Sequence, residues 1–261
     1  ASLVYAYQMA EEADGATNYY KVEEYYKFRY TDQQIYLLDY QRSMEQIIDT
    51  ASVNVSGNIL SVGVTSDTTG YLSNETGTIV SFVQSGQLFE YNQNKQTFTK
   101  VYGFIDDPTD ARQSYGQHNI RILNIDETGN MDFVVYGYMN RGQHEGESGI
   151  DLYHYDSIKQ EAIEQVFIAT THSYQILNAD FSDLLYENAD GDFYIMMGGT
   201  LAKVGLDDLS TKELITNLKS DQYAVSSSGR YVAWMTEDDV ADQISIMDLE
   251  TEKVRTIDAA K

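Results

Sequence analysis

Short apolar runs alternate with polar turns along most of this chain. Near the C-terminus, an apolar run at residues 231–235 follows a Ser-Ser-Ser-Gly segment. Two further runs, at residues 243–247 and 253–257, are separated by Asp-Leu-Glu-Thr-Glu. Short runs of β-branched and aromatic residues bounded by Gly, Asp and Ser are typical of β-strands joined by tight turns. The segment from residue 223 to residue 257 is therefore predicted to form a small antiparallel sheet.

The same strand–turn–strand pattern recurs upstream, which predicts an array of similar units. Hairpins are expected near residues 34–48, 87–102, 149–168, 200–218 and 243–257. Their turns contain Asp39, Asn92, Asp156, Asp207 and Asp248, which are separated by 53, 64, 51 and 41 residues. Inner strand pairs are expected at 120–125 with 131–139, and at 174–177 and 184–186 with 192–197. Residues 159–169 fit a helix as well as a strand, because short apolar runs are ambiguous.

The motif that carries a family resemblance lies in the last unit. It reads Ser227-Ser228-Gly229-Arg230-Tyr231-Val232-Ala233-Trp234, followed by Ile244-Ser245-Ile246-Met247-Asp248-Leu249. This resembles a blade of the TolB-like or WD40-like β-propellers, which share an S-x-D-G inner turn and an I-x-[VI]-x-D-[LV] outer hairpin. Here Ser replaces the turn Asp, and the Trp-Asp dipeptide is absent.

The resemblance implies an all-β chain built as a β-propeller-like array of four-stranded antiparallel blades. About five blades are expected, as a single domain over residues 1–261 or as a fragment of a larger propeller. It implies a fold and not an activity, because propellers support many functions.

Charge and cysteine content narrow the classes of partner. Asp and Glu number 41 against 17 Lys and Arg, which gives a formal net charge of −24. Such a chain repels a phosphate backbone, so no nucleic-acid partner is expected. No apolar stretch approaches the roughly 18 residues of a membrane helix, so no membrane insertion within this chain is expected. Cysteine is absent, which excludes disulfides and thiolate chemistry and favours an extracytoplasmic or cell-surface location.

One candidate site is a calcium-binding loop. Side-chain oxygens recur at alternate positions, on Asp126, Thr128, Asn130 and Asp132. Hard cations such as Ca²⁺ need several such oxygens from one tight loop. The alternative is a hairpin turn in which the same side chains bind the backbone. Apart from this Ca²⁺ candidate, no cofactor is expected.

A second candidate is the Gly-rich loop at residues 140–149, which is long for a hairpin. It offers Arg141, His144, Glu145 and Glu147 as ligand-binding side chains. Loops held on a rigid scaffold often carry binding residues. The alternative is a solvated loop without a ligand. A third candidate is the group of seven tyrosines between Tyr19 and Tyr40, whose rings can stack on sugars or pack in the core.

The sequence contains no nucleophile elbow, P-loop or dinucleotide-binding glycine motif. We therefore expect a non-catalytic binding or interaction module of an extracytoplasmic bacterial protein. It would recognise a protein or carbohydrate partner through loops on one propeller face. The alternative is a glycoside hydrolase-type enzyme with carboxylates in a central pocket. A structural segment of a larger surface protein is a third interpretation.

Overall fold

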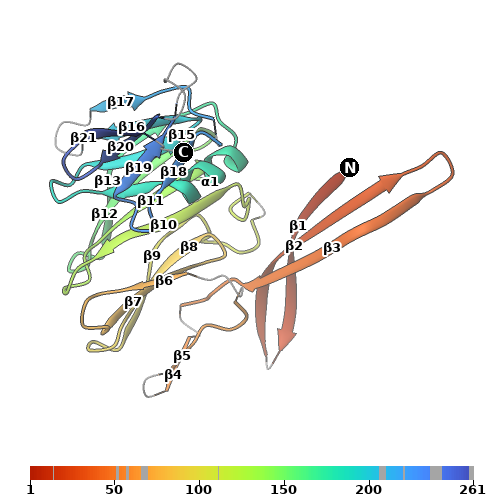
Figure 1. Cartoon of the computed structure of the whole chain (residues 1–261). Coiled ribbons are helices and arrows are strands. Elements are labelled where there is room, and N and C mark those ends of the chain that lie inside the picture. Colours follow the sequence, from red (N-terminus) through yellow and green to blue (C-terminus); the bar gives the residue numbers. More distant parts are fainter. Residues whose placement is uncertain are drawn as a thin grey trace. The chain divides into compact units, whose positions relative to one another are not determined.

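The computed structural model of the chain is almost entirely β-structure (Figure 1). It describes residues 1–13, 15–50, 53–56, 59–65, 70–110, 112–205, 210–219, 221–235 and 243–258. The chain packs as two compact units. The first holds Ala1–Glu147 and Tyr153–Ile163, and the second holds Ser148–Leu152 and Glu164–Lys261. The prediction of one domain over residues 1–261 stays a prediction beside these two units.

The first unit begins with a three-stranded antiparallel sheet in the order β1-β2-β3, and continues with a two-stranded sheet and a four-stranded sheet. The strands are β1 (Ser2–Ala13), β2 (Ala16–Tyr30), β3 (Ile35–Gln46), β4 (Asn54–Ser56), β5 (Ile59–Ser61), β6 (Tyr71–Ser73), β7 (Ile79–Gln84), β8 (Gln87–Asn92) and β9 (Thr97–Gly103). A second four-stranded sheet follows, with strands β10 (His118–Ile125), β11 (Met131–Tyr138), β12 (Ser148–Asp156) and β13 (Glu161–Ala169). The hairpin β12–β13 belongs partly to each unit.

The second unit contains two more four-stranded sheets and a helix. Its elements are α1 (Tyr174–Asp183), β14 (Leu185–Glu187), β15 (Phe193–Met197), β16 (Thr200–Val204), β17 (Thr211–Ile215), β18 (Tyr223–Val225), β19 (Tyr231–Trp234), β20 (Gln243–Asp248) and β21 (Lys253–Asp258). Every four-stranded sheet in the described part of the chain is a meander, with its strands in sequence order. This is the form of a propeller blade, so the expected all-β array of four-stranded antiparallel blades is confirmed.

Four of the predicted hairpins match pairs of adjacent strands: β8–β9, β12–β13, β16–β17 and β20–β21. Residues 161–169 form a strand and not a helix. The predicted turn residues Asn92 and Asp156 both cap turns. Asn92 Oδ1 accepts from Lys95 N (3.0 Å), and Asp156 Oδ1 accepts from Ile158 N (3.0 Å). The predicted turn residue Asp207 lies outside the described residues.

Two predicted elements differ from the structure. The hairpin expected near residues 34–48 is one continuous strand, β3, that pairs with β2 along its length. Its supposed turn, Gln41-Arg42-Ser43, has no Gly, Asn or Asp, so pairing with the 15-residue β2 outweighs the weak turn signal. The strand expected at 174–177 is the start of α1, which Ser173 caps because its side chain accepts from Ile176 N.

No helix in the described part of the chain combines the length and the apolar run that crossing a bilayer requires. Helix α1, the helix that replaces the expected strand, has only 10 residues.

One turn geometry recurs between the first two strands of every described meander. The turns begin at Asn74, Asp126, Asn188 and Ser226, and each has a glycine three residues later. The glycine N–H donates to the carbonyl of the first residue at 3.1, 3.2, 3.0 and 2.9 Å, respectively. All four glycines have positive φ, between 70° and 94°, which other residues adopt only at a cost. The first residue's side chain accepts at least one backbone N–H in each turn.

The core of the first unit contains polar groups as well as rings. Phe82, Phe89 and Phe98 form a ring cluster with centroids 5.4 to 6.2 Å apart. All six residues of β8 are buried, including Glu90, whose Oε2 has no hydrogen-bond partner. Burial raises the pKa of the Glu90 carboxyl to about 7, against a smaller opposing effect of Lys95.

The core of the second unit joins its two meanders. It contains Leu184, Tyr194, Met196, Leu201, Leu218, Val232, Met247 and Leu249. The family-like motif lies beside this core. Arg230 donates to both carboxylate oxygens of Asp248 at 2.8 Å, and Leu249 N donates to Arg230 O at 2.9 Å. These contacts join the inner turn to the end of β20, and they show why the motif combines a turn Arg with a strand-end Asp.

Replacing Glu90 with Gln is expected to stabilise the protein at about pH 8, by about 1–3 kcal/mol. The folded-state pKa is raised, so stability falls as pH rises from the unfolded-state value of 4.5 to about 7. At higher pH the folded chain carries a buried charge that Gln lacks. Below about pH 4 both states are protonated, and the advantage of Gln disappears. Thermal unfolding across this pH range measures the difference. The matched control is Glu75→Gln at an exposed position, and an equal pH-dependent gain there would contradict the assignment.

Candidate functional site

The predicted ligand-binding loop is an ordered turn in the first unit. Met139 N donates to Glu147 O at 2.8 Å, and Gly146 N donates back to Met139 O at 2.9 Å. Glu147 N also donates to His144 O at 3.0 Å. These bonds close the loop across its base, so it does not match the alternative of a solvated loop without internal structure.

Two neighbouring residues fasten this loop to the segment before β10. The buried Asn140 donates through Nδ2 to Gln113 O (3.2 Å) and to Tyr115 O (2.7 Å). Arg141 Nη2 lies 2.9 Å from Asp110 Oδ2. A hydrogen bond from Arg112 and the charges of both arginines lower the pKa of Asp110 to about 2. Arg141 is therefore occupied by a structural ion pair.

The structure separates the four predicted loop residues. Arg141 bonds to Asp110, whereas Glu145 and Glu147 are exposed. His144 is half-buried and joins two carboxylates outside the predicted set, Asp151 on β12 and Glu164 on β13.

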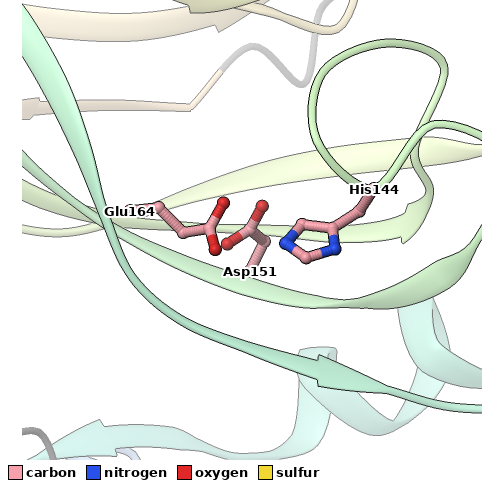
Figure 2. A group of neighbouring side chains, drawn as sticks. All are labelled: His144, Asp151 and Glu164. Carbon is pink, nitrogen blue, oxygen red and sulfur yellow. The ribbon is translucent and has the colours of Figure 1, made fainter.

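His144, Asp151 and Glu164 form a compact group of metal-ligating side chains (Figure 2). One ligand atom from each side chain lies within 4.8 Å of the others. Figure 2 shows the imidazole and the two carboxylates turned toward one another. The three residues come from the β11–β12 loop and the two strands that follow it, within one sheet. Asp151 is only 1% exposed, so an ionised carboxylate there needs compensating positive charge.

Sequence reasoning missed Asp151 and Glu164. A signal for Asp151 was present, because it interrupts the apolar strand segment between Ile150 and Leu152, which are both buried. A charged residue on a buried face is informative in a way that an exposed one is not. Glu164 carried no comparable signal, since its neighbours on β13 are mostly half-buried.

The predicted calcium loop is one of the four recurring turns. Asp126 Oδ1 accepts from Thr128 N (2.8 Å), Thr128 Oγ1 (2.7 Å) and Asn130 N (2.9 Å). Burial raises the pKa of Asp126, but these donors outweigh it and the pKa is lowered. Asn130 Oδ1 accepts from Ser157 N at 3.0 Å. The oxygens expected to bind Ca²⁺ thus bind donors of the protein itself.

Asp132 does not join this group. It lies on β11, where its Oδ1 is 2.7 Å from Nδ1 of His154 on β12. The structure therefore brings Asp126, Thr128 and Asn130 together and pairs Asp132 with a histidine. Calcium binding by the four residues stays a prediction.

The sheet β1–β3 carries a large exposed apolar surface at the end where β2 turns into β3 (Figure 1). We call this the exposed sheet end and define it by Leu3 52%, Val4 56%, Tyr5 56%, Tyr30 73%, Ile35 66%, Leu37 55%, Leu38 53% and Tyr40 46% exposure. Consecutive residues of β3 are exposed, so side chains on both faces of this strand meet solvent. Such a patch on a folded protein typically marks an interaction surface.

The tyrosines of this sheet are only partly available for sugar stacking. Tyr7, Tyr26 and Tyr40 all donate their hydroxyls to Glu24, at 3.2, 2.6 and 3.1 Å. The bond to Glu24 raises the pKa of Tyr26 to about 12. Their polar ends are thus engaged within the sheet, whereas Tyr30 is 73% exposed.

Comparisons with known proteins show no matching family model and no curated relative. Similar solved structures include TolB from Acinetobacter baumannii, at 11% identity and TM-score 0.39, covering 92% of this chain and 50% of that one. A puromycin-hydrolyzing peptidase from Mycobacterium tuberculosis matches at 11% identity and TM-score 0.45, covering 95% and 37%. The extracellular domain of a putative hybrid two component system from B. thetaiotaomicron matches at 15% and 0.40, covering 82% and 26%. The chain spans half or less of these proteins, and similarity at this level assigns no function.

Replacing Asp126 with Ala is expected to destabilise the protein by about 1 kcal/mol, because it removes the acceptor that caps the turn. The loss should be the same with calcium and with EDTA, since Thr128 and Asn130 donate to Asp126 without a metal. Thermal unfolding in both conditions measures it.

The control for that experiment is Asp126→Asn, which keeps an acceptor oxygen and removes the charge. The turn interpretation predicts near wild-type stability, as in the equivalent turn that begins with Asn188. A calcium-dependent stabilisation of the wild type that is lost in Asp126→Asn would instead establish the calcium site.

Proposed function

We propose that this chain is a non-catalytic interaction module of an extracytoplasmic protein and that it binds a protein partner through the exposed sheet end. The observation that carries the proposal is the uninterrupted exposure of β3 from Ile35 to Tyr40. The extracytoplasmic location rests on the absence of cysteine. Recognition through propeller loops, as expected from the sequence, is a separate proposal with no printed contact in its favour.

The position of β3 suggests how the partner binds. β3 pairs with β2 on one side and is the last strand in the sheet order β1-β2-β3. An edge strand presents unpaired backbone N–H and C=O groups to any extended segment that lies beside it. Strand addition would satisfy these groups and bury Ile35, Leu37 and Leu38 at the same time. A partner segment with alternating apolar residues fits both faces.

The local charge supports a protein partner. Residues 25–42 contain three basic residues, Lys27, Arg29 and Arg42, against two acidic ones, Asp32 and Asp39. The chain as a whole has a net charge of −24. An apolar segment flanked by acidic residues can therefore approach this end of the sheet without the repulsion that it meets elsewhere. Mixed Leu, Ile and Tyr side chains also favour a protein over a sugar, which stacks on aromatic rings alone.

The glycoside hydrolase alternative has one candidate pair of carboxylates, Asp151 and Glu164. Their close approach resembles the short spacing of retaining glycosidases, about 5 Å. However, Asp151 is 1% exposed, and a buried carboxylate cannot reach a polysaccharide. This burial is the reason that we prefer the non-catalytic function.

A peptide-display selection on the purified chain tests the proposal. A library of short random peptides should yield sequences with alternating apolar residues, because these fit strand addition. Leu37→Glu should weaken their binding about tenfold or more, because it places a charge in the contact. Ile158→Glu, at an 84% exposed position in the β12–β13 turn, is the matched control and should leave binding unchanged.

The amides of β3 should also gain protection from hydrogen exchange when the selected peptide binds. Equal binding by Leu37→Glu, or no enrichment of apolar sequences, would overturn the proposal. A concentration-dependent dimer of the wild type, abolished by Leu37→Glu in sedimentation experiments, would assign the surface to a second copy and overturn the choice of a different protein.

A further inference from the structure

A buried pair of carboxylates beside an imidazole needs an explanation that the proposed function does not supply. Asp151 is 1% exposed and lies between Ile150 and Leu152, at 0% and 2% exposure. Two carboxylates brought together out of water repel each other, and each loses hydration. A bound cation relieves both costs, because it neutralises the two charges together. We infer that His144, Asp151 and Glu164 bind a divalent transition-metal ion of the Zn²⁺ or Mn²⁺ class.

The geometry of the three side chains suits a single ion. Their ligand atoms all lie within 4.8 Å of one another. An ion about 2.1 Å from each donor sets the donors roughly 3 to 3.5 Å apart. The two distances differ by no more than a rotation of flexible side chains can supply, and Glu164 and His144 are only half-buried. Figure 2 shows all three groups directed toward one common point.

The chemistry of the donors selects the kind of ion. Calcium and magnesium prefer oxygen ligands, whereas imidazole nitrogen suits zinc, manganese and similar metals. Three protein ligands leave at least one coordination position for water or another molecule. The net charge of −24 raises the local concentration of any cation around the chain.

The scaffold holds these ligands in place before an ion arrives. Asp151 and Glu164 lie on the adjacent strands β12 and β13 of one sheet. His144 lies on the loop whose base is closed by Met139 and Glu147, and its own carbonyl accepts from Glu147 N at 3.0 Å. Ligands on fixed elements lose little conformational freedom on binding.

Calorimetric titration of the metal-free chain with Zn²⁺ and Mn²⁺ tests the inference. We expect one saturable ion per chain, with Ca²⁺ and Mg²⁺ bound much more weakly. His144→Ala should weaken binding about tenfold or more, and Glu164→Gln should do the same if His144→Ala alters the loop. His154→Ala is the matched control, because His154 lies on the same sheet and pairs with Asp132.

A second readout reports the nitrogen ligand directly. Co²⁺ in place of the ion should give visible absorption bands that His144→Ala changes and His154→Ala does not. The inference would be overturned by the absence of saturable binding or by equal losses in both histidine variants. Affinity for Ca²⁺ as high as for Zn²⁺ would also overturn it, because it would indicate an oxygen-only site elsewhere.

Discussion

The side chain that begins each inner turn constrains the rest of the architecture. Asn74, Asp126, Asn188 and Ser226 each accept a backbone N–H across the turn, and each is followed by a glycine with positive φ. The turn fixes the register of the first two strands, and a slip of one residue would expose every core side chain of the pair. Phe133 and Val135, for example, would exchange sides with Val134. The registers that bury the core thus depend on four small polar side chains.

This constraint also explains how neighbouring meanders of the first unit join. Glu127, in the second position of its turn, accepts from Asn74 Nδ2 at 3.0 Å and from Thr76 Oγ1 at 2.7 Å in the preceding turn. The polar turns therefore contact one another directly. A single hydrogen bond of this kind contributes about 1 kcal/mol, and removing one partner costs more when the other is buried. Asn74 is 3% exposed, so its turn depends on these contacts.

The parts of the fold that the sequence predicts are those fixed by local chemistry. Asn92, Asp156 and the Ser228-Gly229 step mark turns because their backbone preferences act within a few residues. The continuous strand β3 was not predicted, because its conformation depends on pairing with β2 and not on its own turn residues. The same limit applies to the site. His144 was a candidate from its loop, but its grouping with Asp151 and Glu164 arises from the pairing of β12 with β13.

Two features depart from the regular pattern, and both departures carry a cost in the isolated chain. β3 exposes Ile35 at 66% and Leu37 at 55%, where a stable sheet would bury one face. Asp151 is buried where its neighbours are apolar, which costs several kcal/mol for an uncompensated charge. Sequences that fold well are locally consistent, so an unrelieved conflict usually marks a functional position. A protein segment at β3 and a cation at Asp151 would each remove the conflict at its own position, and neither would relieve the other. The two sites are therefore independent.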